Sequence, residues 1–270
     1  MEQPSSLPSA ASTTPQTQVV DRLAQLPWWL IVIALGGVLL LWQFLTNETY
    51  ITILSRVVSG IGVTLTVALS GYVIAIVVGL LLGLGRVSSN PVVYNLATLY
   101  VQVVRGVPIL VLLFYIALVV IPLVLQVFGI RPATFDFTFR AVIALGLAYA
   151  GFEAETFRAG IQSISKGQME AARSLGMSYA QAMRYVILPQ AIRRVLPPLG
   201  NDFVSMVKDS SLVSVLGVND ITNLARLYAA ASFRYAETFN TLAFMYLSLT
   251  LLLSLGVRWV EKRLSEGRSG

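Results

Sequence analysis

The sequence contains no cysteine and no histidine, and only 12% of its 270 residues are charged. The chain therefore has no thiolate nucleophile, no imidazole base, and no thiolate or imidazole ligand for a metal. It also lacks the pattern Gly-x-x-x-x-Gly-Lys-Ser/Thr, so it has no phosphate-binding loop of that kind. No pair of acidic residues is placed convincingly for carboxylate catalysis. These absences argue against an enzyme and against a cofactor bound by this chain.

Apolar residues dominate instead, with 56% of the chain hydrophobic and a mean hydropathy of +0.75. Soluble domains carry about 25% charged residues. Several apolar runs reach the ~20 residues that a helix needs to cross a ~30 Å hydrocarbon core. None of them shows the period-2 alternation of outer-membrane strands. The sequence therefore predicts an all-α, polytopic membrane protein.

About six membrane-spanning helices are expected after a disordered, Ser-, Thr-, Pro- and Gln-rich tail at residues 1–25. The spacing Gly79-x-x-x-Gly83 permits close helix packing, although glycine is also simply tolerated in membrane helices. Pro108 predicts a break in the third span. The expected spans are residues 28–45, 61–84, a segment within 92–128, 140–157, a segment from Pro197-Pro198 to 207, and 239–257.

Basic residues are distributed unevenly between the two sides of this topology. Most of the 19 Lys and Arg residues fall on the side that holds both termini, and the positive-inside rule assigns that side to the cytoplasm. The net charge of +6 is then mainly a topogenic signal, and no nucleic-acid partner is expected because the chain lacks a soluble basic domain. The cytoplasmic group is Arg22, Arg86, Arg158, Lys166, Arg173, Arg184, Arg193, Arg194, Arg258, Lys262, Arg263 and Arg268; the opposite group is Arg56, Arg131, Arg140, Lys208, Arg226 and Arg234, with Arg105 ambiguous.

A polar, charged segment at about residues 158–190 interrupts the apolar sequence on the cytoplasmic side. Ser165 and Ser178 are each followed three residues later by Gln, and this capping-box spacing predicts the starts of two short helices. Gly176 suits the left-handed end of the first helix, and the second is expected to end before Pro189. On local physics alone, the segment is either an ordinary solvated loop or a small helix that inserts into a groove of a partner protein.

The motifs of this segment are Glu170-Ala171-Ala172, then Gly176, and nine residues later Val186-Ile187-Leu188-Pro189. They resemble the cytoplasmic signature of permease subunits in binding-protein-dependent ABC importers, with Val186 in a position where Ile is usual. Motifs elsewhere are similar to the polar amino acid branch of that family, so the resemblance covers about residues 60–263. They are Gly62-Val63-Thr64-Leu65, Arg105-Gly106-Val107-Pro108, the segments 155–164, 187–191 and 196–201, and Lys208-Asp209-Ser210-Ser211-Leu212.

The resemblance implies a type I ABC importer permease fold, with a five-helix core at residues 58–263. Residues 26–57 would add one N-terminal helix, and residues 264–270 would form a cytoplasmic tail. The chain would be a multi-pass protein of the bacterial inner membrane with both termini in the cytoplasm. Two separate ABC ATPase subunits would bind ATP and Mg²⁺, while a second permease subunit, identical or paralogous, and an extracytoplasmic amino-acid-binding protein would complete an importer that works by alternating access.

In such permeases the cytoplasmic loop is a coupling helix that docks into a cleft of the ATPase. The resemblance carries this role directly to the signature residues, with Gly176 supplying the turn. The expected coupling site is Glu170, Ala171, Ala172, Gly176, Met177, Leu188 and Pro189.

Glu153 is the main candidate for substrate recognition, because ionisable groups at membrane depth are costly and commonly line a pathway. Relatives usually have a small or apolar residue there. We hypothesise that Glu153 faces the translocation cavity and attracts an ammonium group or a cationic side chain; alternatively, it lies at the cytoplasmic interface and pairs with Arg158 or Arg105.

Five further polar residues complete the candidate substrate pathway: Gln102, Arg105, Asn201, Lys208 and Asp209. Arg105 and Lys208 are suited to bind a substrate carboxylate. For Lys208, however, we expect a structural ion pair with Asp209 that anchors the end of the fifth span. A helix-to-helix hydrogen bond is likewise expected for Gln102.

Asp202 is placed to satisfy backbone donors freed by a break at Pro197-Pro198. The alternative function from another class is a self-sufficient channel or a proton-linked secondary transporter that uses Glu153, although no inverted repeat is evident.

Overall fold

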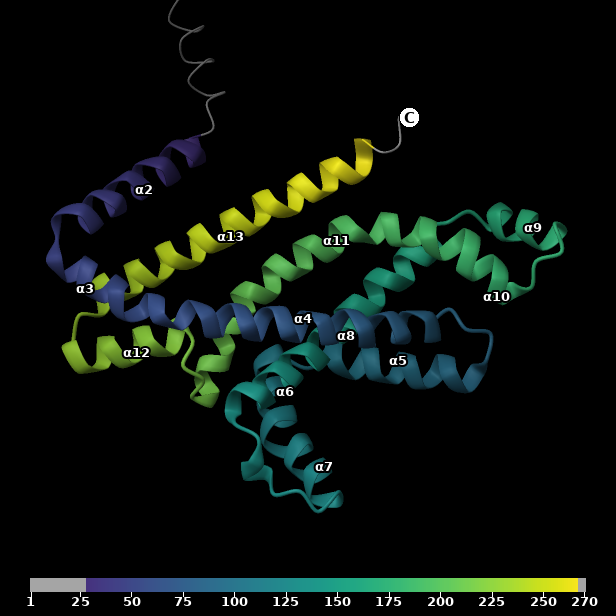
Figure 1. The fold of residues 1–270 in the computed structure, drawn as a ribbon, viewed down its shortest axis with the longest axis horizontal. Coiled ribbons are helices and arrows are strands. Elements are labelled where there is room, and N and C mark those ends of the chain that lie inside the picture. Colours follow the sequence, from purple (N-terminus) through teal and green to yellow (C-terminus); the bar gives the residue numbers. More distant parts are fainter. Residues whose placement is uncertain (1–27, 267–270) are drawn as a thin grey trace, which may run out of the picture. The chain divides into compact units, whose positions relative to one another are not determined.

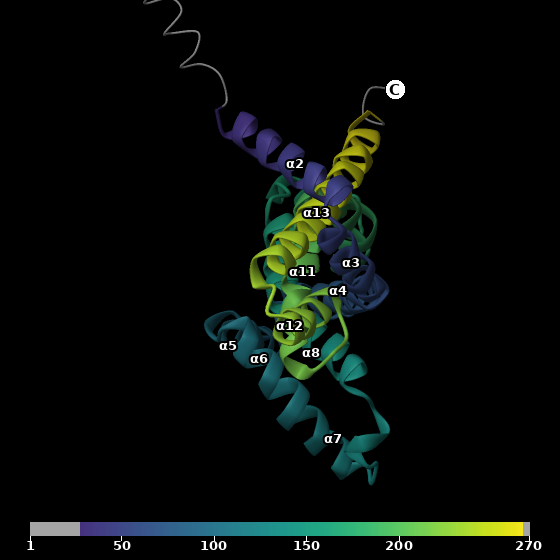
Figure 2. The ribbon, with the colours of Figure 1, turned by 90° about the vertical axis from the view of Figure 1, so that its left-hand side faces the viewer.

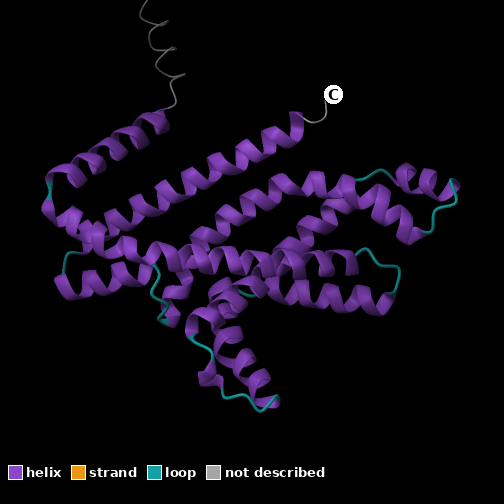
Figure 3. Ribbon diagram, in the orientation of Figure 1, coloured by secondary structure: helices purple, strands orange, loops and turns teal. Residues whose placement is uncertain are grey.

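Helices joined by short loops make up residues 28–266, the part of the chain that this computed structural model describes (Figure 3). No strand occurs among these residues. The expected tail at residues 1–25 lies outside them, and the last helix continues to Glu266, past the start expected for the C-terminal tail. The all-helical prediction is therefore confirmed for the described residues.

The chain divides into two compact units, Met1–Glu48 and Thr49–Gly270, which are treated separately. In the first unit, α2 spans Trp28–Thr46 without a charged residue. Its bounds agree with the first expected span. The absence of charge on any side of the helix is typical of a segment surrounded by apolar material.

The second unit contains the remaining helices, beginning with α3, of which only the first residue, Glu48, belongs to the first unit. Figure 1 shows α4, α5 and α8 running alongside one another. The α-helices are α3 (Glu48–Val57), α4 (Ile61–Gly85), α5 (Pro91–Gly106), α6 (Ile109–Tyr115), α7 (Ile121–Val127), α8 (Phe137–Gln162), α9 (Lys166–Ser174), α10 (Tyr179–Ala182), α11 (Leu188–Asp209), α12 (Ile221–Ser232) and α13 (Tyr235–Glu266).

Four helical segments among the described residues are long and apolar enough to cross a membrane. They are Glu48–Gly85, Ile109–Val127, Phe137–Gln162 and Tyr235–Arg263, with Ile31–Thr46 as a shorter apolar helix. These segments include the expected spans at 61–84, 140–157 and 239–257. The expected third span is divided into two parts, α5 and the helical segment from α6 through α7. Figure 2 shows this second part extending away from α4 and α11.

The most extensive helix contact in the second unit is between α4 and α8. A Cβ atom added at Gly79 would lie 2.5 Å from the Cβ of Glu153, and one added at Gly83 would lie 2.8 Å from the Cβ of Phe157. Both distances are shorter than real Cβ contacts allow. The expectation that Gly79-x-x-x-Gly83 brings two helices together is confirmed, since only glycine leaves room for the facing backbone.

The expected break near Pro108 is also confirmed. Helix α5 ends at Gly106, Val107 is extended with φ −105° and ψ 137°, and α6 begins at Ile109. A residue before proline avoids the helical region because its own backbone would clash with the proline ring. The break therefore follows from Val107-Pro108 alone.

Two other prolines follow π-helical turns instead of ending a helix. Pro122 lies two residues after the end of the turn Ile116–Val120, and Pro189 two residues after the end of the turn Met183–Ile187. A proline ring clashes with the carbonyl four residues earlier in an α-helix, and a π turn widens the helix at that point. The prediction that the second loop helix ends before Pro189 is therefore wrong, because the helical path continues into α11.

The expected break at Pro197-Pro198 is likewise wrong. Helix α11 runs from Leu188 to Asp209 with both prolines inside it, so the span does not start after them. The two missing N–H groups would have bonded the carbonyls of Arg193 and Arg194. Both residues are exposed, so their carbonyls can be solvated, and the helix continues.

The two ends of the helix bundle can be recognised from contacts. Arg86, after α4, and Arg158, in α8, both bind the carboxylate of Glu155, so they lie at one end. At the other end, the hydroxyl of Thr64 accepts a hydrogen bond of 3.2 Å from the backbone N–H of Ile221. Figure 1 shows α9 and α10 toward the first end of the second unit and α12 toward the other. This separation agrees with the sides expected for Arg86, Arg158 and the loop.

Candidate functional site

Helix α9 ends in a Schellman motif at Gly176. Gly176 has φ +84°, its N–H donates to the carbonyl of Arg173 at 3.0 Å, and the N–H of Met177 donates to the carbonyl of Ala172 at 3.2 Å. These are the two bonds of that motif, which needs a left-handed residue at its centre. The guanidinium of Arg173 also donates to the carbonyl of Met177 at 3.0 Å. The predicted left-handed turn is confirmed and is tightly bonded.

Helix α10 starts with the expected capping box. The hydroxyl of Ser178 accepts from the N–H of Gln181 at 3.2 Å, and the Gln181 side chain accepts from the N–H of Ser178 at 2.8 Å. Helix α9 starts directly after Ser165, as predicted, but the Ser165 side chain makes no cap bond, so the capping box expected there is not formed. The side chain of Gln168 instead accepts from the amide of Gln190 in α11 at 3.3 Å, and so joins two helices.

The loop is fixed to the rest of the second unit by an apolar cluster. Ile161 in the last turn of α8 and Ile164 just after this helix pack with Ile187 and Ala191 around the start of α11. Half-buried residues of α4, of the loop that follows it, of α9 and of the π turn join this cluster: Leu84, Val87, Met169, Met183 and Val186. A displacement of α9 would therefore be passed to α4, α8 and α11 together, since packed side chains transmit strain.

The outer face of the loop exposes apolar side chains next to charged ones. Leu175 is 84% exposed and Tyr185 is 62% exposed. With Gly176, Met177 and Gln181 they line a surface depression of about 270 Å³. Large apolar side chains grouped on a polar, rigid surface mark a protein contact more often than a solvated loop.

The predicted coupling residues divide between the two faces of the loop. Ala172 is buried, Met177 and Leu188 are half-buried, and Glu170, Ala171, Gly176 and Pro189 are exposed. Ala171 and Leu175 lie four residues apart on the exposed side of α9. The exposed signature residues Glu170, Ala171 and Gly176 thus lie on the same part of the loop as the exposed Leu175.

Glu153 lies inside the helix bundle, not on an open surface. Its side chain is completely buried, and neither carboxylate oxygen makes a hydrogen bond with a described residue. The prediction that it faces a cavity is not met in this conformation. The alternative is wrong as well, because Arg158 and Arg105 bind Glu155 and not Glu153.

One other acid and two tyrosines, Tyr72 and Tyr149, lie near Glu153. Asp202 and Tyr72 are close enough to act on it electrostatically. The Tyr72 hydroxyl donates its proton elsewhere, to the carbonyl of Leu199. Asp202 accepts from the hydroxyl of Thr156 at 3.4 Å, so it contacts α8 and caps no helix break. Uncompensated carboxylates at membrane depth are rare, and they mark functional sites.

Glu155 is the residue that sequence analysis missed. Its carboxylate binds the guanidinium groups of Arg86 and Arg158, and Arg105 lies 3.7 Å away. Arg105 lies in the last turn of α5, three residues before Pro108, so this cluster connects α4, α5 and α8 at the loop end of the bundle. The family motif that begins at Glu155 could have drawn attention to this residue. The sequence does not indicate, however, that Arg86, Arg105 and Arg158 meet at its carboxylate.

The remaining pathway candidates do not come together. Gln102, Asn201 and Lys208 are exposed, and the predicted ion pair between Lys208 and Asp209 is not formed. Asp209 instead accepts a hydrogen bond of 2.7 Å from the hydroxyl of Tyr149 in α8. Because Gln102 is exposed, the expected helix-to-helix bond is also not made within the described residues.

No group of three His, Cys, Asp or Glu side chains that could hold a metal ion occurs in residues 28–266. The geometry is that of a polytopic helical membrane protein in which the loop at residues 158–190 ends α9 with a bonded turn and is anchored to α4, α8 and α11.

A family model described as the inner membrane component of binding-protein-dependent transport systems matches residues 75–266. The chain belongs to this family, which confirms the resemblance seen in its motifs.

Relatives and solved structures extend this result. The chain is 38% identical over 200 residues to the probable glutamine ABC transporter permease protein GlnM of Bacillus subtilis (strain 168). The aligned region covers 74% of this chain and 88% of that protein. It is 35% identical over 207 residues to the glutamine transport system permease protein GlnP of Escherichia coli (strain K12), covering 77% of this chain and 92% of that protein.

A solved amino acid ABC transporter with histidines aligns with a TM-score of 0.69 and 38% identity, covering 82% of this chain and 98% of that one. The predicted type I permease fold is confirmed.

Proposed function

We propose that this chain is the transmembrane subunit of an ATP-driven importer that moves a polar or charged amino acid by alternating access. The observation that carries the proposal is the loop at residues 158–190, with its bonded turn, its apolar outer face and its anchorage to three helices. Such an element is suited to receive force from a partner. The amino acid is proposed because named relatives are glutamine permeases.

Force transmission would be mechanical. An ATPase that moves α9 would act on the cluster around Ile161, Ile187 and Ala191, and through it on the ends of α4, α8 and α11. Packed interfaces of this kind respond by rigid-body motion between discrete states. The Glu155 cluster would hold α4, α5 and α8 together during that motion.

The chain is not proposed to hydrolyse ATP. Two separate ABC ATPase subunits would bind ATP and Mg²⁺ and dock on the exposed face near Leu175 and Tyr185. A second permease subunit, identical or paralogous, and an extracytoplasmic amino-acid-binding protein would complete the transporter. The predicted topology places both termini on the cytoplasmic side of the inner membrane.

Glu153 is proposed to serve the substrate pathway when the helices rearrange. It is closed off in this conformation, and its carboxylate makes no ion pair within the described residues. An ammonium group or a cationic side chain of the substrate would supply the missing positive charge once a rearrangement exposes the Glu153 carboxylate. Arg105, half exposed beside Glu155, is proposed for the substrate carboxylate.

The change Glu153→Gln is expected to lower uptake of arginine relative to glutamine by about tenfold, because a charge-assisted hydrogen bond contributes about 1.5 kcal/mol or more. Competition between the two labelled amino acids in cells that express the whole transporter measures this ratio. Glu237→Gln, which removes an acid from α13, is the matched control and should leave the ratio unchanged. If the Glu153→Gln variant and the native chain showed the same affinity for arginine and the same selectivity over glutamine, Glu153 would have no role in the substrate pathway.

The function itself is tested by uptake into vesicles that contain the chain with and without its ATPase. Uptake is expected only with the ATPase, with internal ATP and with the binding protein outside.

A further inference from the structure

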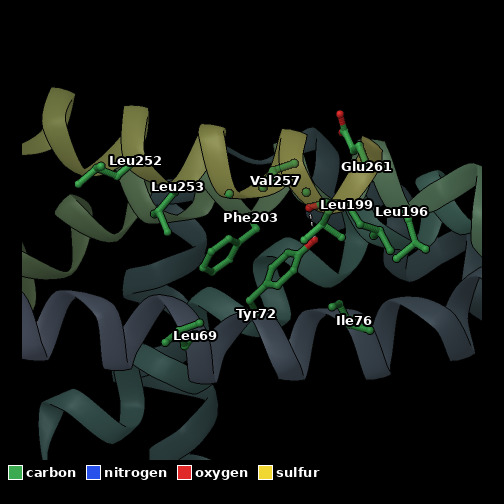
Figure 4. A pocket seen from close by; sticks show the side chains of 13 residues that line it. Leu69, Tyr72, Ile76, Leu196, Leu199, Phe203, Leu252, Leu253, Val257 and Glu261 are labelled. Carbon is green, nitrogen blue, oxygen red and sulfur yellow. Dashed lines mark hydrogen bonds between the residues drawn. The ribbon is translucent and has the colours of Figure 1, made fainter. Parts of the chain in front are cut away.

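A groove of about 500 Å³ runs between α4, α11 and α13 (Figure 4). Its lining is apolar except for Tyr72 and Glu261. The hydroxyl of Tyr72 is already bonded to the carbonyl of Leu199, and the Tyr72 and Phe203 rings pack with their centroids 5.1 Å apart. The floor of the groove therefore offers no unsatisfied polar group, and it suits a hydrocarbon chain.

The groove opens sideways from the helix bundle. Leu69 on α4 is 52% exposed and Leu252 on α13 is 67% exposed, and both line it. A Cβ atom added at Gly256 would meet nothing within 4 Å, so this glycine leaves room that a larger side chain would fill. An occupant can therefore enter from the surrounding bilayer without moving a helix.

The length of the groove matches one leaflet of a membrane. Its lining on α13 extends from Leu252 to Glu261, which is about 14 Å at the rise of an α-helix. Half of a ~30 Å hydrocarbon core is about 15 Å. The lining also lies in the C-terminal half of the span Tyr235–Arg263, next to the basic end of that helix.

Basic side chains gather where the groove ends. Arg258, Lys262 and Arg263 lie within the last turns of α13, and Arg193 comes one turn before the lining residue Leu196 on α11. All four are exposed, and the guanidinium of Arg263 stands 5.0 Å above the ring of Trp259. Glu261 is the one acid at this end of the lining, so positive charge exceeds negative charge.

We propose that this groove binds one acyl chain of an anionic phospholipid from the basic-side leaflet, with the lipid phosphate held by Arg193. Basic clusters beside a groove between membrane helices are suited to such headgroups. The same basic residues also help to set the orientation of the chain in the membrane. That role does not explain why an apolar groove lies beside them. Because the groove touches α4, α11 and α13, the bound lipid would hold α13 against the two helices that reach the loop cluster.

The test uses the full chain with Trp259 as its only tryptophan, through Trp28→Phe, Trp29→Phe and Trp42→Phe. The chain is reconstituted in phosphatidylcholine vesicles that contain phosphatidylglycerol or phosphatidylcholine brominated in the acyl chains. Trp259 lies one helical turn from Gly256, so a lipid in the groove quenches its fluorescence. Brominated phosphatidylglycerol is expected to bind several-fold more strongly than brominated phosphatidylcholine.

Gly256→Leu should abolish this preference by filling the groove, and Leu255→Phe, on the same helix but outside the lining, should keep it. Arg193→Gln should weaken phosphatidylglycerol binding about fivefold. Arg131→Gln, in the opposite group, is the charge control.

Equal quenching by the two lipids would overturn the proposal, as would a preference that survives Gly256→Leu. A disulfide between two chains that carry Leu252→Cys would also overturn it, because a second copy would then occupy the groove.

Discussion

Replacing Gly176 by valine is expected to reduce substrate-stimulated ATP hydrolysis of the assembled transporter at least tenfold, while the chain still inserts into the membrane. Gly176 has φ +84°, and a non-glycine residue in this region costs about 1–3 kcal/mol. A β-branched residue tolerates it least. The two bonds that end α9, from Gly176 and from Met177, would be lost or weakened. The outer face of the loop would then no longer present Leu175 in one fixed position.

Gly167→Val is the matched control for this substitution. Gly167 lies in the same helix, has no positive φ, and a Cβ atom there would meet only the Ser165 hydroxyl, at 4.0 Å. Its hydrolysis rate should stay within about twofold of the native value, since glycine in a helix is not favoured over valine. If Gly176→Val retained normal stimulation by loaded binding protein, the loop would not be the coupling element.

Replacing Gly79 by valine is expected to prevent stable folding. The new Cβ would lie 2.5 Å from that of Glu153, and 3.2 Å from the backbone at Ala150 and Ala154. The backbone of α8 cannot turn away as a flexible side chain would, so the two helices must separate. Overpacking of this kind costs about 3 kcal/mol, or roughly a hundredfold in the folding equilibrium. The measurement is the fraction of purified chain that elutes as a single species in detergent, followed through thermal unfolding.

Gly62→Val provides the comparison in the same helix. Nothing lies within 4 Å of a Cβ atom at Gly62, so the variant should elute and unfold as the native chain does. Equal stability of Gly79→Val and Gly62→Val would show that the contact between α4 and α8 is looser than described.

Sequence alone was sufficient for features that depend on nearby residues. Apolar runs located α2, α4, α8 and α13, Pro108 gave a break, and Gly176 gave a left-handed turn. The Ser178 capping box was equally local. Each of these follows from steric or hydrogen-bonding rules that act within a few residues, so neighbouring sequence determines them.

Features that depend on distant neighbours were predicted poorly. The π turn before Pro189 lets a helix continue where proline alone suggests an end. Gln168 bonds Gln190 across the loop, which removes it from the expected cap at Ser165. The arginines expected near Glu153 bind Glu155 instead, two residues away and on a different side of α8. The sequence pattern of α8 does not indicate which of its polar side chains faces which neighbouring helix.

ATP-dependent uptake by the reconstituted transporter tests the central claim most directly. Vesicles are prepared with the chain alone, with the chain and its ATPase, and with the Gly176→Val chain and its ATPase, each with loaded binding protein outside. The account predicts accumulation of labelled amino acid only with the native chain, the ATPase and internal ATP, and no uptake by the chain alone under a proton gradient. Gradient-driven uptake by the chain alone would contradict it and would favour a self-sufficient transporter.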